Sequence, residues 1–173
     1  MKKIILLTAI AMIAFTSNSF AQEQTAFVAT SANVITPIAI APGIALNFGD
    51  IVGTATGGTV TISADGTTRT PSDPNLLIGQ EAGFTAATFT VTGEANYTYS
   101  INPPAAPFLV SNGETTPETM EVSGFATAPD ATGTLSTEGA QTVTVGAMIT
   151  LAANQASGTY TSNEGLVIAV QYN

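Results

Sequence analysis

Four separate stretches of this chain alternate apolar residues with threonine or serine, and this pattern constrains the fold more than any other feature. They are residues 58–63, 88–92, 97–101 and 141–145. Successive side chains of a β-strand point to opposite faces, so a period of two predicts strands with one face in a core. Threonine suits the outer face, because its branched Cβ fits a pleated backbone. The side chains expected in the core are Val60, Ile62, Phe89, Val91, Val143 and Val145.

Further strands are predicted where apolar residues recur between turn signals, at residues 26–40, 45–51, 120–126, 147–152 and 166–172. No segment after the leader has a convincing helical stripe. We therefore predict an all-β fold: a single immunoglobulin-like or jelly-roll β-sandwich of about eight strands, with a closed barrel as the alternative. Residues 64–82 form the one long stretch without alternation, and loops of this length usually carry function or are flexible.

The first 21 residues are organised as a secretory signal peptide. Lys2 and Lys3 precede an apolar run at residues 4–15, and Ser19 and Ala21 are the small residues of a cleavage site. A membrane anchor would need about 18 to 20 apolar residues, which is more than this run supplies. We expect cleavage after Ala21, a single mature domain over residues 22–173, and export to the periplasm, the cell surface or the extracellular medium.

Composition excludes most chemistries from the mature chain. All 12 acidic residues follow the leader, and Arg69 is the only cation that remains with them. Nucleic acids and anionic membranes bind through Lys and Arg, so we expect neither nucleic-acid binding nor membrane insertion. The chain has no His and no Cys, which excludes Ser-His-Asp, Cys-His and His-based metal sites. The acids are scattered singly, so we predict no carboxylate pair, no enzymatic activity and no cofactor.

Two weaker candidates for binding sites have structural explanations. Residues 65–68 and 72–75 offer oxygen ligands for calcium, but neither has the spacing of a calcium loop. Asp and Asn also form turns through bonds to their own backbone, so no metal site is predicted. Tyr97 and Tyr99 share one face of a strand, and we expect core packing there in preference to stacking on a sugar.

The two ends of the mature chain indicate strand exchange. Residues 24–40 are small, mostly apolar and uncharged, and the chain stops immediately after the strand at 166–172. An open sheet edge either aggregates or is filled by an added strand. The residues proposed for exchange are Phe27, Val28, Ala29, Val34 and Ile35, and those proposed for the acceptor end are Gly158, Tyr160 and Tyr172. The alternative is that the two ends are simply first and last strands paired to each other.

Several motifs occur in a recognisable order: LNFG at 46–49, FTVTG at 89–93, YTYSI at 97–101, VTVGA at 143–147, GTY at 158–160 and VQYN at 170–173. Together they resemble the bacterial family catalogued as domain of unknown function 4402, across nearly the whole mature chain. The resemblance implies a small exported β-sandwich and assigns no catalytic residues.

The ends are also similar to those of chaperone–usher pilins. Those pilins end in a strand with a penultimate aromatic, as Tyr172 is here, and have a glycine upstream, in the place of Gly158. Their N-terminal extension, in the place of residues 25–35, completes a neighbour's sheet. Many of them carry a disulfide, whereas this chain has no Cys.

These features favour a non-enzymatic structural subunit of a bacterial surface filament or fimbria-like assembly. Its expected partners are further copies of itself or other surface subunits, and a periplasmic chaperone is a candidate partner. The alternative function is a monomeric secreted binding module that presents residues 64–82 to a glycan or a protein.

Overall fold

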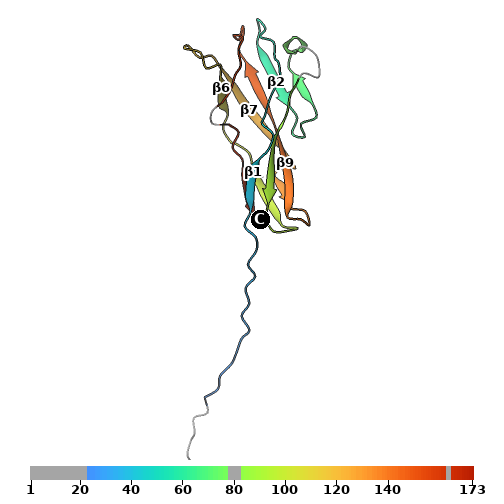
Figure 1. Cartoon of the computed structure of the whole chain (residues 1–173), viewed down its shortest axis with the longest axis vertical. Helices are drawn as coiled ribbons and strands as arrows, with labels where there is room; N and C mark the ends of the chain where they lie inside the picture. The colour runs from blue at the N-terminus through green and yellow to red at the C-terminus, as the bar shows by residue number, and fades with distance from the viewer. Residues whose placement is uncertain (1–22, 78–82, 163–164) are drawn as a thin grey trace, which may run out of the picture. The chain divides into compact units, whose positions relative to one another are not determined.

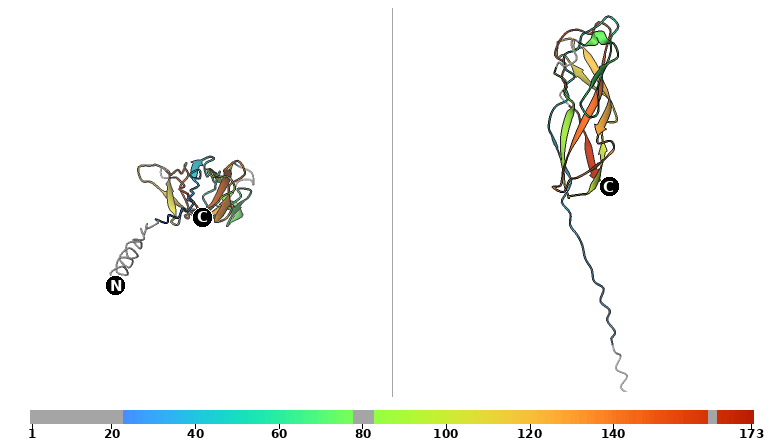
Figure 2. Two further views of the ribbon diagram at one scale, coloured as in Figure 1. Left: turned by 90° about the horizontal axis from the view of Figure 1, so that it is seen from below. Right: turned by 90° about the vertical axis from the view of Figure 1, so that its right-hand side faces the viewer.

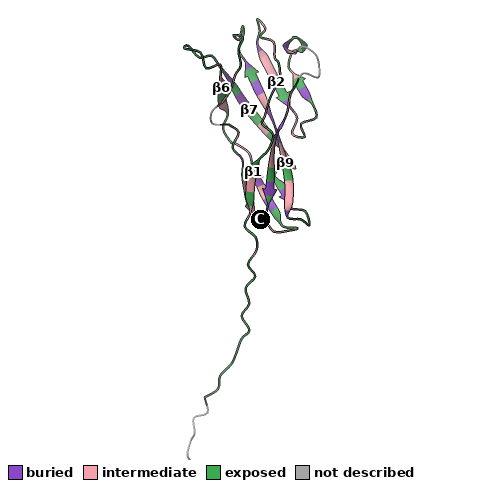
Figure 3. Ribbon diagram, in the orientation of Figure 1, coloured by how far each residue is buried: buried purple, intermediate pink, exposed green. Residues whose placement is uncertain are grey.

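The computed structural model describes residues 23–77, 83–162 and 165–173, and the predicted signal peptide lies outside them. The chain divides into two units, Met1–Val34 and Ile35–Asn173. In the first unit, residues 23–34 belong to no strand and are exposed throughout (Figures 1 and 3). The strand predicted over residues 26–40 is therefore wrong except at its end, because no neighbouring strand pairs with the backbone before Ala39.

The second unit contains two antiparallel sheets (Figures 1 and 2). The first sheet has the order β1 (Ala39–Pro42), β4 (Ala87–Thr92), β9 (Ala140–Leu151), β2 (Gly58–Ile62) and β3 (Arg69–Pro71), with β7 (Thr119–Ala128) also paired to β9 and β6 (Phe108–Ser111) paired to β7. The second sheet has the order β10 (Ala169–Tyr172), β5 (Thr98–Asn102) and β8 (Thr132–Thr134). The predicted all-β sandwich is confirmed, with ten strands in the described residues where about eight were expected.

The strand boundaries differ from the prediction where tertiary pairing overrides local pattern. The strand predicted at residues 45–51 is wrong, because that segment makes only an isolated bridge from Asn47 to Thr85. The stretch at 64–82 contains β3 and a 3₁₀ turn, η1 (Pro74–Leu76), while residues 78–82 lie outside the described part. No helix in the described ranges is long and apolar enough to cross a membrane.

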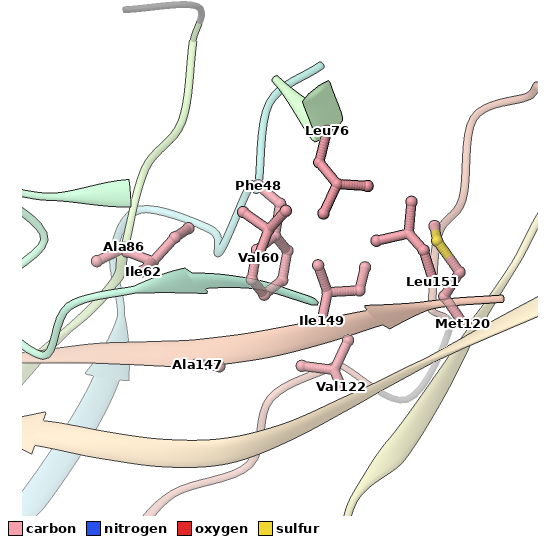
Figure 4. Packing of buried hydrophobic residues seen from close by; sticks show 10 residues of the cluster. All are labelled: Phe48, Val60, Ile62, Leu76, Ala86, Met120, Val122, Ala147, Ile149 and Leu151. Atoms are coloured by element: carbon pink, nitrogen blue, oxygen red, sulfur yellow. The ribbon is translucent and has the colours of Figure 1, made fainter. Parts of the chain in front are cut away.

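The sandwich holds two clusters of buried apolar side chains, and both confirm the predicted faces. Figure 4 shows the first, made of Phe48, Val60, Ile62, Leu76, Ala86, Met120, Val122, Ala147, Ile149 and Leu151. The second consists of Ala87, Val91, Tyr99, Ile101, Leu135, Val143, Val145 and Ile168. Phe89 packs against this second cluster and is partly buried. The core prediction is correct for Tyr99, which is fully buried, and wrong for Tyr97, which is 41% exposed.

Arg69 is a structural residue of the core. It is buried on β3, and its guanidinium donates to the backbone carbonyls of Phe48 at 2.8 Å and Asp50 at 3.3 Å. The same group lies over the Phe84 ring, 5.5 Å from its centroid. Because the two carbonyls belong to a segment without regular sheet pairing, Arg69 replaces part of the ladder that would hold that segment on the domain.

Candidate strand-binding groove

A groove of about 1190 Å³ with an apolar floor opens between two irregular segments of the domain. Its first wall is residues 42–51, and its second wall is residues 155–162. Its floor comes from β6, β7 and β9, through Phe108, Val110, Met120, Val122, Ile149 and Leu151. Figure 4 shows Val122, Ile149 and Leu151 on the same side of their strands. Asp50 is the only charged residue in the described lining.

The first wall is bonded on both sides, because the carbonyls of Phe48 and Asp50 accept from Arg69 on the side opposite the Asn47 bridge. In the first wall, Asn47 and Thr85 exchange two backbone hydrogen bonds of 2.8 Å. In the second, Thr161 and Ser111 exchange bonds of 2.8 and 2.9 Å. Backbone groups of alternate residues in a strand point to opposite edges, so Leu46 and Tyr160 direct theirs away from these bridges. One residue in each wall, Leu46 and Tyr160, is thus placed to bond an added strand.

Contacts between neighbouring segments lie beyond each end of the first wall. Beyond Ile51, the segments that lead to the two walls are joined where the Asn154 amide donates to the Thr54 carbonyl at 2.8 Å. At the other end of the groove, on the N-terminal side of Pro42, β1 and β10 lie next to each other. Ile40 and Val170 pack there on the second core cluster. The opening therefore extends along roughly the ten residues of the first wall, or about 30 Å of extended chain.

A polar network fixes the second wall. The Gln155 side-chain amide donates to Tyr160 Oη at 2.9 Å and to Glu118 Oε2 at 3.0 Å. Tyr160 Oη in turn donates to the Ala156 carbonyl at 2.9 Å, and the Ala156 amide donates to Glu118 at 3.0 Å. These bonds hold the Tyr160 ring in place, where it packs against the first core cluster.

The predicted exchange and acceptor residues lie in different environments. Phe27, Val28 and Val34 are 94%, 87% and 94% exposed, Ala29 is also exposed, and Ile35 is half-buried. Of the three residues predicted for the acceptor end, Gly158 and Tyr160 line the groove. The third, Tyr172, is absent from the lining and lies on β10.

Tyr172 and Glu94 enclose the backbone of Thr36. Tyr172 Oη donates to the Thr36 carbonyl at 2.8 Å and accepts from the Glu94 amide at 2.6 Å. Glu94 Oε2 accepts from the Thr36 amide at 2.9 Å, so both backbone groups of Thr36 are bound. The Tyr97 ring packs edge-on against Tyr172 at a centroid distance of 5.8 Å. We call Glu94 and Tyr172 the Thr36 clamp.

Residues 38–172 match the model of a family described as Domain of unknown function (DUF4402). The chain belongs to this family. The matched range contains the groove and Tyr172, whereas Thr36 and the exposed N-terminal segment precede it. No curated protein and no solved structure matches the chain.

The two calcium candidates of this DUF4402 protein are used as turns. Asp65 Oδ1 accepts from Ser63 Oγ at 2.5 Å and from Thr67 Oγ1 at 2.9 Å, and these bonds, the one from Ser63 first, lower the pKa of its carboxyl. Asp73 caps η1 by accepting from the Asn75 amide at 2.9 Å. Within the described ranges, no group of three or more acidic, His or Cys side chains is placed to hold a metal ion.

The sequence of this DUF4402 protein singled out Gly158 and Tyr160, which line the groove, but not the groove floor. The floor residues lie on β6, β7 and β9, which are far apart in sequence. The only local signal was their alternation, at Met120 and Val122 and at Ile149 and Leu151. Alternation indicates which face of a strand is buried, but not which other element covers that face.

Acid should weaken the Thr36 clamp. Hydrogen bonds from Thr36, first of all from its amide, hold the pKa of the Glu94 carboxyl below its ordinary value. A lowered folded pKa means that the carboxylate contributes fully at neutral pH and loses its contribution as the pH falls through the folded pKa. We expect the hydrogen-exchange protection factor of the Thr36 amide to fall on acidification from about pH 6 to about pH 3.

The matched control for this pH effect is Glu94→Gln, which keeps a carbonyl acceptor but does not titrate. Its Thr36 protection factor should stay level over the same pH range. Identical pH profiles in the two proteins would show that Glu94 ionisation does not control the clamp.

Proposed function

We propose that this protein is a non-enzymatic structural subunit of a bacterial surface filament or fimbria-like assembly, exported from the cell and polymerised by strand addition. The observation that carries the proposal is the groove, because its floor is apolar and each of its walls contains a residue of an isolated β-bridge. An extended peptide in such a groove gains main-chain hydrogen bonds from the walls and buries alternate side chains on the floor.

The N-terminal segment of a second copy has the composition of a strand that would fill this groove. Residues 24–49 contain no charged side chain, so burying part of this segment desolvates no charge. Its even-numbered positions are the more apolar face, with Ala26, Val28, Ala32 and Val34 around a single Thr30. We therefore assign the even-numbered face to the groove floor and the odd-numbered face to solvent.

The free energy gained by burying the apolar side chains of this segment is sufficient for stable association. Burying a valine side chain contributes about 1.5–3 kcal/mol, and this segment supplies Val28 and Val34 together with two alanines. The walls are already formed in the free domain, so only the incoming segment must be ordered, which limits the entropic cost of binding. Other surface subunits with a similar N-terminal segment fit the same groove, as does a periplasmic chaperone that covers it before assembly.

Deletion of residues 22–32 tests this proposal. The full mature chain should run as a heat-sensitive ladder on a denaturing gel when unboiled and as a single band after boiling. The deleted protein should run as a monomer in both samples, because it keeps the groove but lacks the strand that fills it. A synthetic peptide of residues 22–35 should then bind the deleted protein in calorimetry. A mature chain that stays monomeric throughout, or a ladder that survives the deletion, contradicts the proposal.

A further inference from the structure

The Thr36 clamp determines where the N-terminal segment leaves the folded domain. Glu94 and Tyr172 bind both backbone groups of Thr36, at 2.9 and 2.8 Å. Gly93 makes the arrangement sterically possible, because a Cβ at this position would lie 2.1 Å from Tyr172 Oη. The next residue, Pro37, restricts Thr36 to extended backbone, which further limits motion at this point.

The clamp lies before β1 in the chain, and the groove begins at the end of β1. From Thr36 the chain passes through β1, which pairs with β4 from Ala39 to Pro42, and only at Pro42 does the groove begin. Six extended residues separate Thr36 from Pro42, which is about 20 Å at 3.3 Å per residue. A segment rooted at Thr36 must cover that distance before it reaches its own groove.

The N-terminal segment is too short to cover this distance and also fill its own groove. Residues 22–35 precede the clamp, and a return along β1 uses about six of them, with about two more for the reversal of direction. About six residues remain, which fill little more than half of a groove with a wall of ten residues. A second copy's segment does not have to return along β1 and can fill the groove completely.

We propose that Glu94 and Tyr172 are positioning residues that keep a subunit's own N-terminal segment out of its own groove and thereby reserve the groove for a second copy. This inference rests on the proposed function, because it concerns the same groove and segment. Releasing Thr36 and Pro37 adds two residues to the free segment. It also shortens by two residues the stretch of β1 along which that segment must return to reach the groove. About ten residues then reach the groove, which is enough to fill it from within.

The test compares the mature chain with the double variant Glu94→Ala/Tyr172→Phe, which removes both side-chain partners of Thr36 and keeps the aromatic ring. Hydrogen exchange is followed by mass spectrometry and NMR on dilute protein that forms no ladder. In the unsubstituted monomer, amides 26–34 should exchange without protection. In the double variant, exchange of the Thr36 amide should rise about tenfold or more with the loss of two hydrogen bonds. Amides 26–34 should become protected, and the yield of ladder should fall about tenfold.

Two controls separate this inference from the proposed function and from misfolding. Tyr97→Phe alters the ring beside Tyr172 without touching Thr36 and should behave as the unsubstituted chain. Glu94→Ala alone changes one half-buried side chain and should give a smaller effect in the same direction if the double variant is unstable. Protection of amides 26–34 in the unsubstituted monomer, or no protection in a folded double variant, overturns the role of the clamp. Failure of the 22–35 peptide to bind the deleted protein overturns the proposed function instead.

Discussion

We expect the double substitution Val28→Asp/Val34→Asp to leave the protein monomeric at concentrations at which the unsubstituted chain assembles. Both side chains lie on the face assigned to the groove floor, and each valine contributes about 1.5–3 kcal/mol when buried. A carboxylate in their place must be desolvated against Val122 and Ile149 or stay out of the groove. The affinity of a substituted 22–35 peptide for the deleted protein should fall at least about a thousandfold, measured by calorimetry.

The matched control places the same two charges on the opposite face, as Thr25→Asp/Asn33→Asp. It should assemble and bind within about tenfold of the unsubstituted chain, since surface charges of this kind cost little. Neither pair should change the thermal stability of the monomer, because Val28 and Val34 are already 87% and 94% exposed. Equal losses from both pairs would mean that the segment does not bind as a strand with one buried face.

Gly146→Ala should destabilise the domain by about 3 kcal/mol or more, through overpacking that no side chain can relieve. Gly146 is buried in the middle of β9, and a Cβ there would lie 2.3 Å from the carbonyl oxygens of both Ile62 and Ser63. These atoms are backbone, so the end of β2 must move away from β9 and disturb the core beneath it. Urea denaturation followed by circular dichroism gives the free energy of unfolding.

Gly113→Ala provides the comparison for this prediction. Gly113 has a φ of 71°, but no atom lies within 4 Å of the position of its added Cβ. Its substitution should cost about 1–2 kcal/mol, the conformational penalty alone. Equal costs at the two positions would show that the close approach of β2 to Gly146 is relaxed at little expense.

The long alternating strands were predictable because a period of two is a local property. Residues 141–145 showed it, and they form one strand, β9, with the apolar residues 147–151, because Gly146 leaves room for the carbonyls of Ile62 and Ser63. Strands β3 and β8 have three residues each and β6 has four, which is too short for alternation to be visible. The buried position of Arg69 was also invisible, since its partners are backbone carbonyls of a distant segment.

The groove itself could not be predicted from sequence. Residues 45–51 have the composition of a strand, but they are held by a single bridge to Thr85 and by Arg69, which binds two of their carbonyls. Whether this segment borders a groove depends on where residues 155–162 lie, and nothing local in either segment records that distance. The same holds for the bond from the Tyr172 hydroxyl to the Thr36 carbonyl, which joins residues at opposite ends of the domain sequence.

The sequence by itself determined the all-β class, the threonine-covered faces and an uncharged, apolar N-terminal segment, because these follow from composition and from the period of a single strand. Only the tertiary structure decided that Leu46 and Tyr160 lie on the two walls of one groove, and that Glu94 and Tyr172 hold the root of that segment. Both features depend on pairings between residues far apart in the chain, and the alternation of side chains along one strand carries no information about which neighbour will lie beside it.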